Sequence, residues 1–288
     1  MDVSIIIVSY NTGKLLKQCL KSIFEKTKDI TFEVIVVDNF STDGSRQMLK
    51  DEFPNIMLVE SPENLGFGRA NNLGAKSATG KYLFLLNPDT VLLNNAIKIL
   101  SDFMDNNPEA GICGGNLYNE DKKPIHSYSR LPGIIQELKR LLLIPDTDCF
   151  NNTRKPQKVG YVTGADLMIR SGVFNRQSGF DSDFFMYYEE SELTYRVKRE
   201  GYKVYCVPQA QIIHLEQKSF SDNEIRLGMI FKSCKTYYRK THGRIYQTVV
   251  HCILLITIIS RLILFAVLRN KKKINCWKLI LKTYINKN

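Results

Sequence analysis

The chain has 288 residues, which is long enough for one large α/β domain with an appendage. Of these residues 44% are hydrophobic, a share that can fill a core and excludes a disordered protein. A net charge of +11 spread over the whole chain would suggest nucleic-acid binding, but residues 225–288 hold 14 Lys and Arg and no acid. The part before them carries 26 basic and 29 acidic residues, so we expect no nucleic-acid partner.

The seven cysteines are scattered singly, with no C-x-x-C pair and no His at metal-ligand spacing. This usage is typical of reduced, mostly buried thiols in a cytoplasmic protein. The first apolar run has the length of a strand and no basic region precedes it, so we expect no secretory signal.

Apolar runs and helical segments alternate at the start of the chain. Residues 3–8 (VSIIIV) form a β-branched run typical of a buried parallel strand, and Thr12 is placed to cap a helix through residues 15–23. Two more strands are expected at 34–37 and 56–59, with a helix between them. The order βαβαβ predicts a parallel sheet covered by helices.

Residues 82–86 (YLFLL) predict another buried strand, which ends in a polar turn carrying one carboxylate, Asp89. In open α/β sheets this end of a strand faces the ligand crevice, so Asp89 is expected to meet a substrate or a metal. The preceding segment, 64–72 (NLGFGRANN), only superficially matches a dinucleotide fingerprint, since Asn71 replaces the third glycine. A helix N-terminus beside an anionic ligand is preferred over a dinucleotide site.

The middle of the chain is less regular. After a helix around residues 95–104, we interpret residues 110–156 as irregular apart from a strand-like stretch at 111–114, and a strand pattern resumes at 160–170. Strands at 203–207 and 212–214 are expected to complete the domain, and His214 ends the last of them.

Residues 184–196 (FFMYYEESELTYR) hold the densest polar cluster, and a helix is expected to begin near Glu190. Acids in the first turn of a helix are commonly caps. The four aromatic residues before them instead favour a partly buried wall, where desolvation raises a carboxyl pKa and makes the group a better base. Both interpretations remain open on the pattern alone.

Polar residues also follow several strands, where each alone has an ordinary structural explanation such as an Asx turn or a satisfied histidine. Their joint placement is more informative, because parallel strands bring their carboxyl ends to one edge of a sheet. The residues at or just after these ends are Tyr10, Asn11, Asp38, Asn64, Arg69, Asp89 and His214.

Taken in order, six segments resemble the motifs of a family 2 glycosyltransferase of the GT-A fold, most similar to its bacterial rhamnosyltransferase-like branch. The resemblance covers residues 3–219 and implies a Rossmann-like mixed sheet flanked by helices. It divides the chain into a catalytic domain, residues 1–222, and a helical membrane-associating extension, residues 223–288. The segments are VSIIIVSYN, VIVVDNFSTDGS, NLGFGRANN, LFLLNPDT, FFMYYEESELTYR and IIHLEQKS.

The resemblance implies a nucleotide-diphospho-sugar donor. Tyr10, Asn11 and Asp38 are expected to contact its nucleoside, with Asn64 and Arg69 nearby.

The family's DxD motif, whose metal bridges the donor diphosphate, corresponds to residues 87–89. Asn87 stands at its first acidic position, so Asp89 is left as the single carboxylate ligand. His214 matches a position that completes the coordination, and the expected metal is Mg²⁺ or Mn²⁺.

The EESE segment, residues 189–192, matches the family's EDxD motif with Glu in place of each Asp. Glu190 falls where the family has its catalytic base, and Glu189 and Glu192 are the alternatives. The implied reaction inverts the anomeric centre: Glu190 takes the proton of an acceptor hydroxyl as that hydroxyl displaces the diphosphate.

The tail contains a basic helix at 225–240 and an apolar stretch at 249–268 that is about long enough to cross a bilayer. Arg261 near its middle favours a helix lying in the interface over a span, and the basic run 269–273 suits an anionic leaflet. A core helix or an oligomer contact is the remaining alternative.

The sequence thus predicts an inverting, metal-dependent hexosyltransferase on the cytoplasmic face of the cell membrane, acting on a saccharide or lipid-linked acceptor in surface polysaccharide biosynthesis. Residues 118–158 are expected to shape the acceptor site. Because Glu replaces Asp in EESE, a catalytically inactive membrane-bound sugar-nucleotide-binding protein is the alternative.

Overall fold

The computed structural model describes residues 1–145, 149–215 and 223–285. The strands of this part of the chain are β1 (Val3–Ser9), β2 (Phe32–Asp38), β3 (Met57–Glu60), β4 (Tyr82–Leu86), β5 (Thr90–Leu92), β6 (Ala110–Tyr118), β7 (Tyr128–Ser129), β8 (Gln157–Lys158), β9 (Tyr161–Val162), β10 (Asp166–Arg170) and β11 (Lys203–His214). The helices are α1 (Gly13–Lys26), α2 (Ser45–Glu52), α3 (Gly66–Ala75), α4 (Ala96–Asn106), α5 (Ile134–Leu141), α6 (Ser171–Arg176), α7 (Glu189–Arg199), α8 (Asn223–Thr241), α9 (Arg244–Val267) and α10 (Lys271–Ile285).

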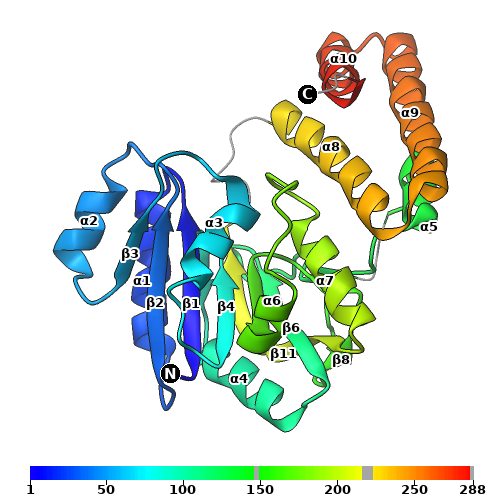
Figure 1. The fold of residues 1–288 in the computed structure, drawn as a ribbon. Helices are drawn as coiled ribbons and strands as arrows, with labels where there is room; N and C mark the ends of the chain where they lie inside the picture. The colour runs from blue at the N-terminus through cyan, green and yellow to red at the C-terminus, as the bar shows by residue number, and fades with distance from the viewer. Residues whose placement is uncertain (146–148, 216–222, 286–288) are drawn as a thin grey trace.

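A mixed sheet organises the described residues (Figure 1). Its strands run in the order β3-β2-β1-β4-β10-β6-β11-β5, with β8 paired to β11, and β7 pairs separately with β9. The first four strands in chain order are mutually parallel, as the βαβαβ pattern predicts. Ser9 pairs with Asp38 and Ile7 with Leu86, so the carboxyl ends of β1, β2 and β4 lie side by side.

Helices cover both faces of the sheet because its strands alternate apolar side chains between two clusters. One cluster joins one face of β1 and β2 to α1, α2 and α4. The other joins the opposite face to α3, α6 and α7. The predicted Rossmann-like mixed sheet flanked by helices is confirmed.

One local expectation is wrong. Thr12 stands at the N-cap of α1, but its hydroxyl lies 2.9 Å from that of Ser9 and makes no cap hydrogen bond to the helix. The predicted strands at 203–207 and 212–214 are both found, as parts of one strand, β11, whose register against β6 shifts between Cys206 and Gln211.

The strand-like stretch at 111–114 lies within β6, but the interpretation of the rest of residues 110–156 as irregular is wrong in part, because β6 continues to Tyr118 and α5 follows it. Strand β6 lies inside the sheet, between β10 and β11. Its glycines weaken the strand signal, yet they are needed for packing: a Cβ at Gly115 would lie 2.5 Å from the carbonyl oxygen of Ala210.

The C-terminal helices α8, α9 and α10 lie together at one end of the molecule, where α9 packs against α5 (Figure 1). They share a third apolar cluster with Phe184 and Tyr188 of the segment before α7. The boundary expected after residue 222 adjoins residues 216–222, which lie outside the described residues, as does the end of the IIHLEQKS motif.

Candidate active site

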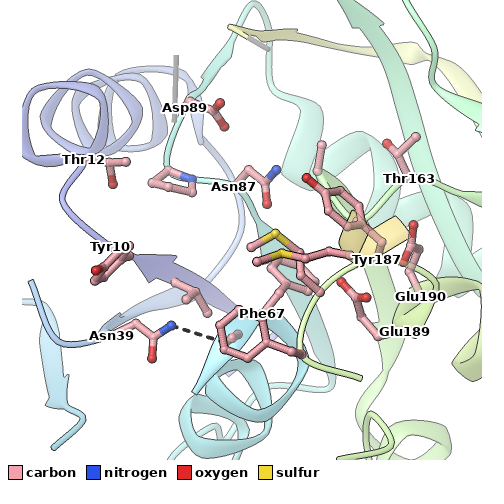
Figure 2. Close-up of a pocket in the computed structure, with 18 of the residues that line it drawn as sticks. Tyr10, Thr12, Asn39, Phe67, Asn87, Asp89, Thr163, Tyr187, Glu189 and Glu190 are labelled. Carbon is pink, nitrogen blue, oxygen red and sulfur yellow. Dashed lines mark hydrogen bonds between the residues drawn. The ribbon is translucent and has the colours of Figure 1, made fainter. Parts of the chain in front are cut away.

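A cavity of about 460 Å³ lies at the carboxyl ends of β1 and β4 (Figure 2). This volume is typical of a small-molecule site. Segments far apart in the sequence contribute to its wall, among them the start of α3, the start of α7 and the first turns of α8. The residues proposed from the sequence that line it are Tyr10, Asn64, Asn87, Asp89, Glu189, Glu190 and His214.

The turn after β4 places Asp89 beside His214. Strand β5 follows this turn at once and pairs with the end of β11, so that Thr90 lies opposite His214. The Nε2 atom of His214 lies 3.3 Å from Oδ1 of Asp89 and 3.4 Å from Nδ2 of Asn87. Asp89 is only 2% exposed. The turn after β4 and the end of β11 therefore bring a buried carboxylate, an amide and an imidazole close together at the cavity.

These donors fit a divalent cation as part of a coordination shell. Carboxylate oxygen and imidazole nitrogen both bind divalent first-row metals, and oxygen is the preferred ligand of Mg²⁺. In residues 1–145, 149–215 and 223–285, however, no group of three or more His, Cys, Asp and Glu side chains is placed to hold a metal ion. A cation bound by Asp89 and His214 would need further ligands, such as oxygens of a bound substrate or of water.

The start of α3 is attached to the segment that precedes the glutamates. The amide of Phe67 donates a hydrogen bond of 2.9 Å to the carbonyl of Phe185. Gly66 has φ +75°, and a Cβ there would collide with that same carbonyl oxygen. The backbone conformation and the close approach both require glycine, so this residue brings the NLGFGRANN and FFMYYEE segments together at the cavity.

Gly66→Ala is therefore expected to lower the free energy of unfolding by about 1–3 kcal/mol, the usual range for a strained backbone position. Urea titration followed by circular dichroism measures this change. Gly172→Ala, in α6, is the matched control, because a Cβ there meets only the end of the Arg176 side chain at 3.5 Å. Equal stability of the two variants would contradict the role given to Gly66.

Two carboxyls of α7 face the cavity, and Figure 2 shows Glu189 and Glu190 beside Tyr187. Tyr187 and Tyr188, just before the helix, both have φ 69°, a left-handed conformation that is strained for tyrosine. The Oε2 atoms of both glutamates are buried and, among the described residues, have no hydrogen-bond partner. Strained backbone and unsatisfied buried carboxyls are typical of functional sites.

The two carboxyls differ in how readily they ionise. Burial raises the pKa of Glu190 to about 7. Burial, together with the adjacent charge of Glu190, raises the pKa of Glu189 well above its usual range. Near neutral pH Glu190 is therefore partly ionised. In its ionised form it is able to accept a proton.

Glu192 lies outside the lining of the cavity. Its carboxylate accepts hydrogen bonds of 2.8 and 2.9 Å from Nε of Arg196, which in turn donates to the carbonyl of Gly179. Glu192 is only 4% exposed. These contacts join α7 to the turn after α6, which favours a structural role for Glu192 over that of a base.

Three further residues proposed from the sequence also lie outside the lining: Asn11, Asp38 and Arg69. Asn11 accepts a hydrogen bond of 2.8 Å from the main chain of the loop after β2. Asp38 is fully buried and pairs with Arg46 at 2.5 Å, and Arg69 donates to the carbonyl of Leu65. In the structure they hold the loops that carry Tyr10 and Asn64, and their contact with a nucleoside stays a prediction.

The wall of the cavity also contains residues that were not among those proposed from the sequence, notably Asn39, Arg226 and Met229. Asn39 donates a 2.9 Å hydrogen bond to Asn64, and its position directly after Asp38 is a signal that was available. Arg226 and Met229 belong to α8, so the tail helps to enclose the site. The guanidinium carbon of Arg226 lies 5.8 Å from the ring centre of Tyr187. Nothing in the tail's own sequence indicates this contact.

Comparison with solved structures defines the fold class. A mannosyltransferase, PcManGT from Pyrobaculum calidifontis, in complex with GDP-Man and Mn²⁺, matches with a TM-score of 0.63 at 15% identity, over 99% of this chain and 86% of that chain. GalNAc-T7 with UDP, GalNAc and Mn²⁺ matches with a TM-score of 0.63 at 19% identity, over 83% of this chain but 48% of that one. The fold is the GT-A fold of nucleotide-diphospho-sugar transferases, as predicted.

The sequence comparisons define the family. The chain belongs to glycosyl transferase family 2, whose model matches residues 4–174. It is 28% identical over 230 residues to the N-acetylglucosaminyl-diphospho-decaprenol L-rhamnosyltransferase of Mycobacterium tuberculosis, covering 73% of this chain and 75% of that protein. It is also 25% identical over 244 residues to the rhamnosyltransferase WbbL of Escherichia coli K12, covering 78% of this chain and 88% of the relative. The predicted similarity to the rhamnosyltransferase-like branch is confirmed.

Proposed function

We propose that this glycosyltransferase is an inverting, metal-dependent enzyme that transfers a hexose or deoxyhexose from a nucleotide-diphospho-sugar to a saccharide or lipid-linked acceptor in surface polysaccharide biosynthesis. The observation that carries the proposal is that Glu190, a carboxyl that ionises near neutral pH, shares one cavity with the Asp89–His214 pair. The mycobacterial relative, named for a diphospho-decaprenol acceptor, supports the lipid-linked alternative.

The donor is proposed to lie along the carboxyl ends of β1 and β4. Tyr10 and Asn64 would bind its nucleoside side, and Asn87, Asp89 and His214 its diphosphate. The neighbours' complexes with GDP-Man or UDP and Mn²⁺ support a divalent cation, Mg²⁺ or Mn²⁺, held by Asp89 and His214. Such a cation, when bound, neutralises charge on the leaving diphosphate.

Glu190 is proposed as the catalytic base. Its carboxylate takes the proton from the acceptor hydroxyl while the hydroxyl oxygen forms the new bond to the anomeric carbon and the diphosphate leaves with the electrons of the old one. Because attack and departure occur on opposite faces, the anomeric configuration inverts. Burial serves this role in two ways, since it raises the pKa of Glu190 and excludes water that would otherwise hydrolyse the donor.

The tail is proposed to attach the enzyme to the cytoplasmic face of the membrane, as a domain of residues 223–288 following a catalytic domain of residues 1–222. Among the described residues one helix, α9, is long and apolar enough to cross a bilayer, and 33% of its most apolar window is buried in the protein. Membrane attachment would place the cavity near a lipid-linked acceptor.

A screen of nucleotide-diphospho-sugars for protection against thermal unfolding, followed by hydrolysis and transfer assays, tests this function. Ligand binding raises the melting temperature by mass action. We expect one donor to protect and to be consumed, with both effects lost on chelation. Protection without turnover in the presence of Mg²⁺ and Mn²⁺ and a polyprenyl-diphospho-sugar acceptor would indicate the inactive sugar-nucleotide-binding protein instead.

The pKa of Glu190 gives a second test. Because the base must be ionised, kcat/KM is expected to rise about tenfold per pH unit below about pH 7 and to level off above it. Steady-state rates from pH 5.5 to 9, with circular dichroism to confirm folding at each pH, measure this profile. A rate independent of pH from pH 5.5 to 7 would contradict the assignment of Glu190 as the base.

A further inference from the structure

Helix α5 has its polar and apolar faces reversed relative to a helix on the surface of a soluble protein. Glu137 is 1% exposed and points inward, where it accepts a hydrogen bond of 2.9 Å from the hydroxyl of Tyr238. Ile135 and Leu142, on the opposite side, are 67% and 65% exposed. A helix in water normally buries its apolar face and exposes its charges, so the outer face of α5 suits an apolar environment.

Helix α9, which packs against α5, is apolar on its outward face as well as on most of its buried face (Figure 1). The buried face holds Val250, Leu254 and Ile258 together with two polar residues, Thr257 and Arg261. Its outward face carries a stripe of apolar side chains at helical spacing, which are between 49% and 76% exposed: Ile256, Ile259, Ile263 and Val267.

Arg261 joins the two helices. Its guanidinium donates hydrogen bonds of 3.1 and 2.8 Å to the carbonyls of Arg140 and Leu141, at the C-terminal end of α5. A cation there is favoured by the helix dipole and satisfies carbonyls that have no partner within the helix. Arg261, whose charge makes a simple membrane span unfavourable, is thus shielded by protein. The apolar stripes of α5 and α9 stay exposed on the outer surface.

We propose that α5 and α9 together form one lipid-docking surface, whose outward Ile and Leu side chains enter the interface of an anionic bilayer. For α9, this inference rests on the membrane attachment of the tail proposed above. For α5 it is new, because α5 belongs to the predicted catalytic domain. Leu143 and Ile144, which follow α5 and are 67% and 50% exposed, continue its apolar face.

The positive charge of the tail indicates that the surface of α5 and α9 is covered by a bilayer and not by a protein partner. The end of α9 leads into Arg269, Lys271, Lys272 and Lys273, all exposed, and no acidic residue occurs from Ile225 to the end of the chain. A basic cluster beside an exposed apolar stripe matches the headgroup and acyl layers of an anionic membrane.

The lipid-docking surface lies next to the active site, because α5 contacts the segment that carries the glutamates. Arg140 of α5 donates a 3.2 Å hydrogen bond to the hydroxyl of Tyr188, the residue that directly precedes Glu189. The same helix would therefore meet the lipid on one side and support the catalytic segment on the other. A sugar carried on a membrane lipid would reach the cavity without leaving the bilayer surface.

Flotation of the full chain with vesicles of phosphatidylcholine and phosphatidylglycerol tests the inference. The double variant Leu142→Glu/Leu143→Glu is expected to weaken vesicle binding about tenfold or more, because both side chains are exposed and would meet acyl chains. Met57→Glu, at an exposed apolar position of β3 far from α5, is the matched control and should bind as the unaltered chain does. Unchanged thermal stability of each variant confirms that the fold is intact.

Contact is measured directly by tryptophan quenching. Leu143→Trp is expected to be quenched by brominated lipids beyond the background of the native Trp277, and Met57→Trp is not. If Ile256→Glu/Ile263→Glu abolishes vesicle binding while the α5 double variant binds normally, the tail alone attaches the protein and this inference is wrong. A different result would also overturn the inference. If the unaltered chain does not bind vesicles but self-associates, and the α5 double variant abolishes this self-association, then a second copy of the chain covers the surface instead of a bilayer.

Discussion

Replacing Glu190 with Gln is expected to lower kcat by about 10²–10⁴-fold, the usual contribution of a general base. The amide is nearly isosteric with the carboxyl but cannot accept the proton of the acceptor hydroxyl. Donor binding should stay within about twofold of the unaltered enzyme, because the proposed donor contacts lie on the β1 and β4 side of the cavity. Transfer rates at saturating donor and acceptor, with a separate donor Kd from calorimetry, measure the two effects.

Glu189→Gln is the matched control for this experiment. Burial and the neighbouring charge of Glu190 raise the pKa of Glu189 well above its usual range, which favours the neutral form of the native carboxyl. An amide resembles that neutral group in size and charge, and the effect on kcat should be small. The substitution keeps Glu190, so the fall of activity at acid pH should remain.

The outcome separates the three candidate bases. A large loss in Glu189→Gln together with near-normal activity in Glu190→Gln would move the base to Glu189. Glu192→Gln would weaken the contact with Arg196, so its expected effect is on thermal stability rather than on the pH profile. If none of the three variants loses turnover, the base lies outside the EESE segment and the mechanism proposed here is wrong.

The sequence predicts those elements of the fold whose signals lie within the element itself, and misses those that depend on contacts with distant segments. The strands that begin at Val3, Phe32 and Tyr82 were predictable because each is a short apolar run bounded by turn residues. Strand β6 was predictable only in part, because Gly111, Gly114 and Gly115 are poor strand formers that allow close packing with distant segments. The reversed helix α5 resists prediction for a related reason: periodicity identifies a helix face but does not say which environment that face meets.

In the candidate site, too, some residues could be predicted from their own segment, whereas other features depend on the folded chain. Asp89, Glu190 and His214 could be proposed because each follows or begins a predictable element, and the sheet edge then brings them together. The motif match ranked Glu190 above Glu189, but nothing in the sequence supplied a physical reason for this order, since the ionisation of both carboxyls depends on burial in the folded chain. Arg226 was unpredictable because α8 reaches the cavity through packing against α7 and the segment before it.

Asp89→Asn is expected to weaken binding of the nucleoside diphosphate about tenfold or more in the presence of Mn²⁺, and to have little effect in the presence of chelator. Asp89 is the single carboxylate in the Asn87–Asp89 turn, so the variant leaves this turn without a negative charge. Calorimetric titration with UDP, GDP and dTDP, with and without Mn²⁺, measures the change. Asp102→Asn, at an exposed acid paired with Lys98 on α4, is the control and should bind normally.

Asn87→Asp changes the same turn in the opposite direction, and this makes the test specific for a metal. It adds a carboxylate whose atoms would lie near Nε2 of His214, which is 3.4 Å from the native amide nitrogen. If Asp89 and His214 hold a divalent cation, a second carboxylate should tighten Mn²⁺-dependent binding of the diphosphate, because affinity for hard cations grows with ligand charge. If Asp89 only shapes the turn, the added charge should repel the diphosphate and weaken binding whether or not metal is present. The sign of this one change therefore distinguishes a metal ligand from a structural carboxylate.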